Sequence, residues 1–154
     1  MKIFTLRTYN FFASPMVFFI ASTVWFLILA QTISFFYGLF IFTLLVFLIF
    51  RAGFTINRRA GMLFGIKTKK QVLAISLVVA AGFAEIFWAV SFMPFSFYTL
   101  GGIMAVVFTV SFIVLKSYYE RLDIKSLMIK NILFGIILIA IFIGISSWLP
   151  KNRF

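Results

Sequence analysis

Two long segments of this chain are almost without charge, and they limit what it can fold into. No charged residue occurs from Thr8 to Phe50, and only Glu85 is charged from Gln71 to Leu115. A soluble domain exposes charged side chains on its surface, whereas a helix of about 20 apolar residues spans the hydrocarbon core of a bilayer. These two segments therefore predict transmembrane helices.

The composition agrees with this interpretation, because 64% of the residues are hydrophobic and only 11% are charged. We predict an all-α integral membrane protein, a bundle of about five transmembrane helices that forms one domain over residues 1–154. The second span is the weakest, because its 17 residues reach only ~25 Å as a helix. The predicted spans are residues 11–32, 34–50, 72–93, 99–116 and 131–149.

The basic residues predict the orientation of these spans, because cytoplasmic loops carry an excess of Lys and Arg. Twelve of the fourteen basic residues precede the first span or lie in the second and fourth connections, and only Lys151 and Arg153 follow the last span. The N-terminus is therefore predicted to be cytoplasmic and the C-terminus to lie outside. We expect the cytoplasmic membrane of a prokaryote. The inner membrane of an organelle is the alternative.

The segment 51–70 interleaves six basic residues with apolar ones, a composition typical of chain that lies among anionic lipid headgroups. Its glycines argue against a continuous helix. The segment 116–130 mixes both signs of charge and is expected to form a short amphipathic connector. The residues predicted to contact headgroups are Arg51, Arg58, Arg59, Lys67, Lys69 and Lys70.

Reactive side chains are scarce in this sequence. Cysteine and histidine are absent, and only Glu85, Glu120 and Asp123 are acidic. Thiolate nucleophiles, the usual zinc ligands and the commonest general base are therefore missing. We expect no metal site, no cofactor and no enzymatic activity. The net charge of +11 is assigned to lipid contact and orientation rather than to nucleic acid, because no soluble module is left to bind it.

Glu85 is the residue that most suggests a function, because an ionisable group inside a predicted span is rare and costly. Small residues surround it on the same helical face, at Ala81, Gly82 and Ala89. The fourth span offers small residues of its own at Gly101, Gly102 and Ala105, so we expect the third and fourth helices to pack closely near Glu85. The hydroxyl groups expected to share hydrogen bonds with it are those of Ser22, Thr23 and Thr109.

Two roles for Glu85 follow from its place in the sequence. As a neutral acid it would bridge helices by hydrogen bonds, and as a functional group it would relay protons or cations or meet a positive charge from a partner subunit. The first hypothesis for the whole chain is a structural or accessory subunit of a larger membrane assembly, associated with copies of itself or with other subunits. The alternative is a small oligomeric proton-coupled transporter or channel that uses Glu85. An enzyme acting on lipid-embedded substrates ranks third.

Overall fold

The computed structural model describes the backbone of residues 2–59, 61, 66, 68–120 and 124–146, and side chains within these ranges except at 2–11, 120 and 124–128. The described residues form five helices: α1 (Lys2–Leu29), α2 (Phe35–Arg59), α3 (Lys69–Val90), α4 (Phe97–Glu120) and α5 (Ile124–Ile145). The first four are long and apolar enough to cross a membrane. The described apolar part of α5, Ile129–Ile145, is shorter. The prediction of a helical membrane bundle is thus supported at the level of fold class.

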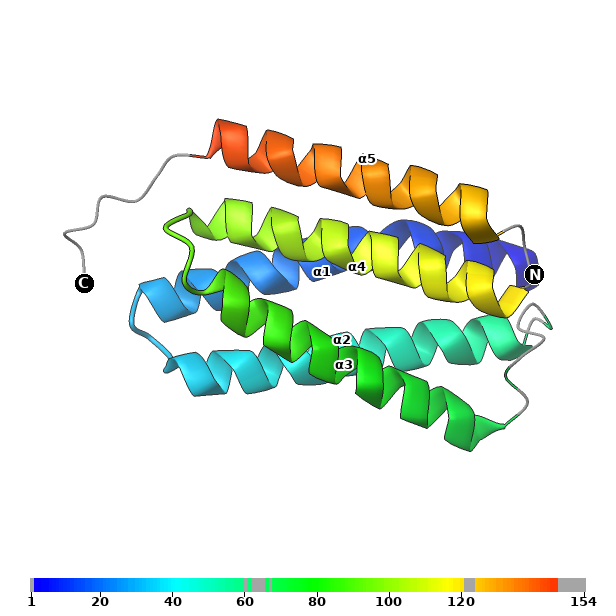
Figure 1. Cartoon of the computed structure of the whole chain (residues 1–154). Coiled ribbons are helices and arrows are strands. Elements are labelled where there is room, and N and C mark those ends of the chain that lie inside the picture. Colours follow the sequence, from blue (N-terminus) through cyan, green and yellow to red (C-terminus); the bar gives the residue numbers. More distant parts are fainter. Residues whose placement is uncertain (1, 60, 62–65, 67, 121–123, 147–154) are drawn as a thin grey trace.

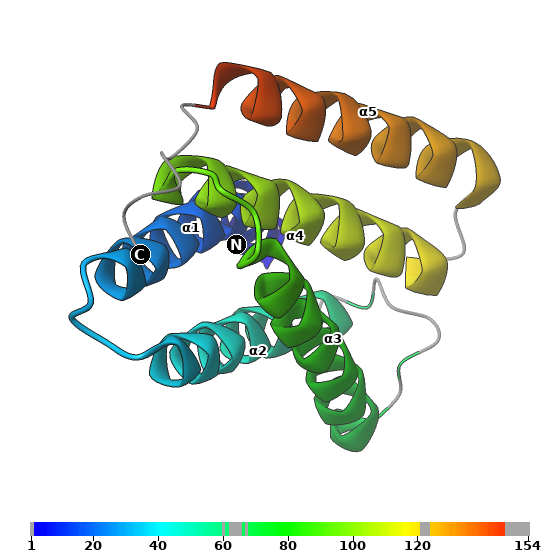
Figure 2. The same cartoon turned by 60° about the vertical axis from the view of Figure 1, so that its left-hand side comes forward.

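The helices are arranged around α1 and α4, which form the most extensive helix pair (Figure 1). Helix α2 packs on α1 and on α3, and α5 packs on α4 at the opposite side of the bundle (Figures 1 and 2). Helix α3 crosses α2, and its Lys69 end splays away from α4 in both views. One side of α3 and much of α5 therefore have no neighbouring helix within the described chain.

Helix α2 is longer than the second span predicted at 34–50, because it continues for nine residues beyond Phe50. It runs for 25 residues, through Arg51 and Gly53, to Arg59. The physical reason is that the buried stripe continues past Phe50 with the same helical spacing, to Gly53, Phe54 and Asn57. The expectation that the glycines of segment 51–70 prevent a continuous helix was therefore wrong for its first nine residues.

Three other helix boundaries also differ from the predicted spans. Helix α3 begins at Lys69 because Thr68 and Gln71 form a capping box, in which each side chain accepts a hydrogen bond from the other residue's backbone N–H. Helix α4 continues to Glu120 and α5 begins at Ile124. The expectation of a separate amphipathic connector at 116–130 was therefore wrong for its described residues, because 116–120 belong to α4 and 124–130 belong to α5.

Aromatic rings fill the centre of the bundle where α1 to α4 meet. Phe87 of α3 stacks on Trp25 at 4.4 Å and on Phe42 at 4.7 Å between ring centroids. Closer to the Arg59 end of α2, Phe50 of α2 contacts Phe108 of α4 at 4.8 Å between ring centroids. Stacked and edge-to-face rings attract one another beyond the area they bury. This core holds the four helices together from one end of the bundle towards the other.

We expect Phe87→Ala to be the most damaging truncation in this core, because Phe87 is 0% exposed and stacks on rings from two other helices. The same change costs about 3–5 kcal/mol in a water-soluble core. The loss here should be smaller, about 1–3 kcal/mol, because lipid tails are as apolar as the core and only packing is lost. Reversible unfolding in mixed micelles measures it, with the exposed Phe36→Ala as the control.

Glycine allows α4 to approach its neighbours closely. A Cβ atom at Gly101 would lie 2.0 Å from Ser22 Oγ of α1, and one at Gly102 would lie 2.6 Å from the Phe142 ring of α5. The expectation that Gly101 and Gly102 contact α3 near Glu85 was therefore wrong. The small residues of α4 are used against α1 and α5, while α3 meets α4 through larger rings such as Phe83 and Phe108.

The outer surface of the bundle is strongly apolar. Large hydrophobic side chains are exposed on every helix, including Phe36 on α2, Val78 on α3 and Ile145 on α5. A soluble monomer rarely exposes continuous apolar surface of this extent. Together with the length of the helices, this surface indicates a membrane protein.

Candidate functional site

Glu85 lies on the outward side of α3. The buried side of this helix is formed by Val72, Ser76, Ala80, Phe83, Phe87 and Val90. Glu85 is two residues from both Phe83 and Phe87, which places it about 200° around the helix from each of them. The side chain is accordingly exposed on the isolated chain. It stands five residues before the end of α3 at Val90, or ~8 Å along the axis, whereas the predicted span continued to residue 93.

The residues around Glu85 form a continuous outward surface, which we call the Glu85 face. Val78 is 73% exposed and Trp88 is 54% exposed, and the small side chains between them leave the helix backbone accessible. A Cβ atom placed at Gly82 would meet nothing within 4 Å. This face comprises Val78, Ala81, Gly82, Glu85, Trp88 and Ala89.

The structure does not bring the three predicted hydroxyl partners to Glu85. Ser22 is buried against Gly101 between α1 and α4, and its hydroxyl has no hydrogen-bond partner. Thr23 is exposed on α1, and Thr109 of α4 bonds to Ser14 of α1 and donates to the carbonyl oxygen of Ala105. No hydrogen bond or ion pair involves Glu85 among the residues that the structure describes. Its carboxyl group faces away from the polar groups of its own bundle.

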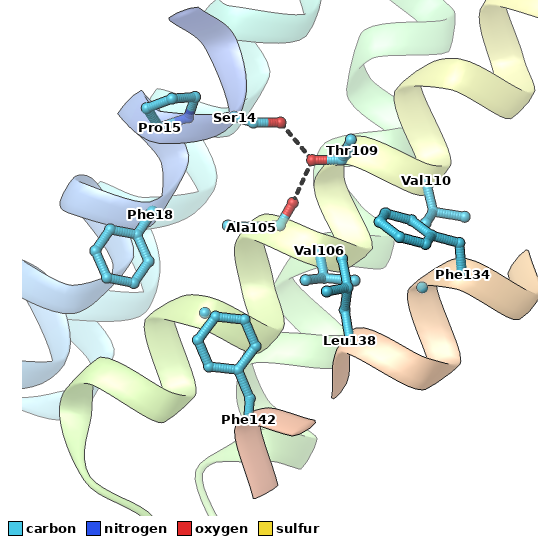
Figure 3. A pocket seen from close by; sticks show the side chains of 12 residues that line it. Ser14, Pro15, Phe18, Ala105, Val106, Thr109, Val110, Phe134, Leu138 and Phe142 are labelled. Atoms are coloured by element: carbon cyan, nitrogen blue, oxygen red, sulfur yellow. Dashed lines mark hydrogen bonds between the residues drawn. The ribbon is translucent and has the colours of Figure 1, made fainter. Parts of the chain in front are cut away.

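Sequence reasoning missed a second feature, a partly open pocket of about 300 Å³ between α1, α4 and α5 (Figure 3). Phe18 of α1 and the rings of Phe134 and Phe142 of α5 line it, together with Val106 of α4. Figure 3 shows the hydrogen bonds that join Ser14 to Thr109 and Thr109 to Ala105 at its edge. The only sequence signal for this pocket was the small residues Gly102, Ala105 and Gly135, which leave space between larger side chains.

The basic residues that sequence analysis assigned to lipid headgroups lie where α2 ends and α3 begins. Arg59, Lys69 and Lys70 are exposed there, and Arg58 is half-buried. Arg51 is also exposed, eight residues before the end of α2, with its guanidinium 6.0 Å from the centroid of the Phe47 ring. Lys67 lies outside the described residues. The same end of the bundle holds the start of α1, the end of α4 and the start of α5 (Figure 1).

Comparison with known proteins adds no family to these observations: the chain matches no protein-family model, no curated protein and no solved structure.

Proposed function

We propose that this chain is a small polytopic membrane protein that serves as a structural or accessory subunit of a larger membrane assembly, without catalytic chemistry of its own. The observation that carries the proposal is the outward position of Glu85. A carboxyl group on the lipid-facing side of a transmembrane helix is costly unless another polar group covers it. A neighbouring subunit is the simplest source of such a polar group.

The partner that fits this surface is a transmembrane helix of a different protein, with a Lys, an Arg or another strong hydrogen-bond donor at the depth of Glu85. Exposed Ala81 and Ala89 and the open space at Gly82 let such a helix approach closely. Among the residues that the structure describes, a second copy of this chain in the same orientation offers no cation at the depth of Glu85, and Lys151 and Arg153 lie outside the described residues. Arg51 is the basic residue of α2 nearest to the end of the bundle where Glu85 lies. It is 16 residues from the start of α2, or ~24 Å, whereas Glu85 lies ~8 Å from the end of α3 at the same end of the bundle.

An oligomeric proton-coupled transporter or channel is the second candidate. It requires Glu85 to line a polar pathway, as an intramembrane carboxyl group does in proton relays. Within one copy the carboxyl group faces away from Ser22 and Thr109. A pathway would therefore have to form between copies, with the Glu85 face of each turned towards a common axis.

The proposed location is the cytoplasmic membrane of a prokaryote, with the basic end of the bundle towards the cytoplasm. This proposal rests on the positive-inside rule, because Arg59, Lys69 and Lys70 are exposed at that end. At the cytoplasmic surface these side chains would meet anionic headgroups.

A photoreactive amino acid at Val78 tests the proposed subunit interface in the native membrane. Val78 is 73% exposed on the Glu85 face, and Leu133 on α5 is an exposed apolar control away from it. We expect the Val78 probe to give one discrete adduct with another protein, and the Leu133 probe to give mainly lipid adducts. Adducts of Val78 with lipid alone would contradict the subunit proposal. Adducts only with a second copy of this chain would favour the transporter, and proton flux in liposomes would then be measured.

A further inference from the structure

The pocket between α1, α4 and α5 has an apolar interior whose polar groups are already bonded. The Ser14 hydroxyl bonds to Thr109, and the Thr109 hydroxyl donates to the Ala105 carbonyl oxygen at 2.7 Å. The rest of the lining is aliphatic and aromatic, from Phe18 of α1 to Phe142 of α5. A cavity lined in this way stays dry and accepts hydrocarbon rather than a polar solute. The occupant of this pocket is therefore apolar over the part that enters it.

The dimensions of the pocket match one lipid tail. Its volume of about 300 Å³ lies at the lower end of ligand pockets. Along α5 the lining extends from Phe134 to Phe142, which is ~12 Å of helix. One leaflet of the hydrocarbon core is ~15 Å thick. A chain that enters from one membrane surface would thus follow the pocket over most of a leaflet.

Two lysines lie between the pocket and the basic end of the bundle, one on α4 and one on α5. Lys130 precedes Phe134 by one helical turn, on the same side of α5. Lys116 follows Thr109 by seven residues on α4, which returns it to the same side ~10 Å further along the axis. Both lysines come before the pocket when it is approached from this end, so they mark where a negatively charged headgroup would lie.

We propose that this pocket binds one acyl chain of an anionic phospholipid, whose headgroup lies beside Lys116 and Lys130. The apolar interior selects the hydrocarbon chain, and the two lysines select the negative headgroup. The open side of the pocket admits the chain from the surrounding bilayer without separation of α4 and α5. This site is independent of the Glu85 face, which lies on α3. It does not depend on the proposed subunit function.

The test uses the full chain in vesicles of phosphatidylglycerol and phosphatidylcholine, with one lipid at a time carrying a photoreactive group near the end of its acyl chain. After illumination, labelled peptides are located by mass spectrometry. We expect phosphatidylglycerol to label α4 and α5 residues of the pocket, such as Val106 and Phe142. The attraction between one lysine and an anionic headgroup is about 1 kcal/mol, so each lysine should give about fivefold preference for phosphatidylglycerol over phosphatidylcholine.

Two sets of variants separate a specific site from general contact with lipid. Ala105→Phe places a ring in the pocket and should reduce labelling there about tenfold. Gly144→Leu adds bulk to α5 at a position where a Cβ atom meets nothing within 4 Å, and should leave labelling unchanged. Lys116→Gln with Lys130→Gln leaves the pocket intact and should remove the preference for phosphatidylglycerol.

Labelling spread evenly over the exposed apolar residues of α3 and α5, and unaffected by Ala105→Phe, would overturn the proposal. Equal labelling by the two lipids in the unmodified chain would overturn the role of the lysines. The lysine variants also protect the test against misfolding of Ala105→Phe, because they change only side chains outside the pocket lining.

Discussion

Gly101→Ala is expected to destabilise the bundle by about 1–3 kcal/mol, the usual cost of forcing extra volume into a packed interface. The added Cβ atom would lie 2.0 Å from Ser22 Oγ and 3.0 Å from both the Cβ and the backbone nitrogen of Ser22. Rotation of the hydroxyl group relieves only the first contact. The other two persist, so α1 and α4 must separate by several tenths of an ångström along the most extensive helix interface of the fold.

Gly144→Ala is the matched control for this change, because it adds the same methyl group to a helix where nothing lies within 4 Å. Alanine is favoured over glycine inside a helix by about 1 kcal/mol, so the control should be neutral or slightly stabilising. Unfolding of each variant in mixed micelles gives the two values. Equal stability for the two variants would show that α1 and α4 do not meet closely at Gly101.

A double-mutant cycle with Ser22→Ala isolates the contact further. The Ser22 hydroxyl is buried without a partner, so its removal alone should be neutral or mildly stabilising. Combined with Gly101→Ala it removes the shortest contact, and we expect the double variant to recover part of the lost stability. The coupling between the two positions should be 0.5 kcal/mol or more, about the lower limit for residues in direct contact.

The fold class could be read from the sequence because it depends on one property, the length of apolar segments without charge. The extent of α2 could not be read in this way, because Arg51 and Gly53 suggested an end to the helix. The signal that predicts its continuation is the spacing of Phe42, Val46, Phe50 and Phe54, which all lie on the buried side. The end of α2 therefore follows the packing of its buried stripe rather than the position of Arg51.

The neighbours of Glu85 were harder to predict than its presence. Gly101 and Gly102 of α4 and the small residues around Glu85 on α3 suggested mutual contact, since small residues favour close approach. The sequence alone does not state which small surfaces pair. In the structure the large rings of Phe83 and Phe87 turn towards the core, and this rotation carries Glu85 to the outside. The large side chains on the opposite side of α3 therefore determine that Glu85 faces outward.

If the proposed partner binds through the Glu85 face, charge reversal at Glu85 is expected to release it without unfolding this chain. Glu85 makes no hydrogen bond or ion pair within the described part of the chain, so Glu85→Lys removes no internal polar interaction. At the proposed interface the new lysine would repel a Lys or Arg of the partner, and it would have no counter-charge opposite a neutral donor. A charged side chain without a counter-charge at membrane depth costs about 2.5–3.5 kcal/mol, which corresponds to about a hundredfold loss of affinity.

Glu85→Gln keeps the size of the side chain and its ability to form hydrogen bonds, so it distinguishes a charged partner from a neutral one. If the partner supplies Lys or Arg, Glu85→Gln should lose most of the affinity that Glu85→Ala loses. If the partner supplies a hydroxyl or amide group, Glu85→Gln should retain most of it, because an amide still donates and accepts. The measurement is the amount of partner that copurifies after gentle extraction, with the unfolding midpoint of the isolated chain as the control for folding.

Gly82→Leu tests the same interface by shape alone. A Cβ atom at Gly82 meets nothing in the chain, so the isolated protein should keep its stability, whereas a helix docked on the Glu85 face would be pushed away. Gly144→Leu, equally open on α5, should keep the partner bound. Loss of the partner with Glu85→Lys and Gly82→Leu but not with Gly144→Leu would locate the interface on α3. Retention of the partner in all three variants would show that this face is turned to lipid, and that the assembly forms through another surface or not at all.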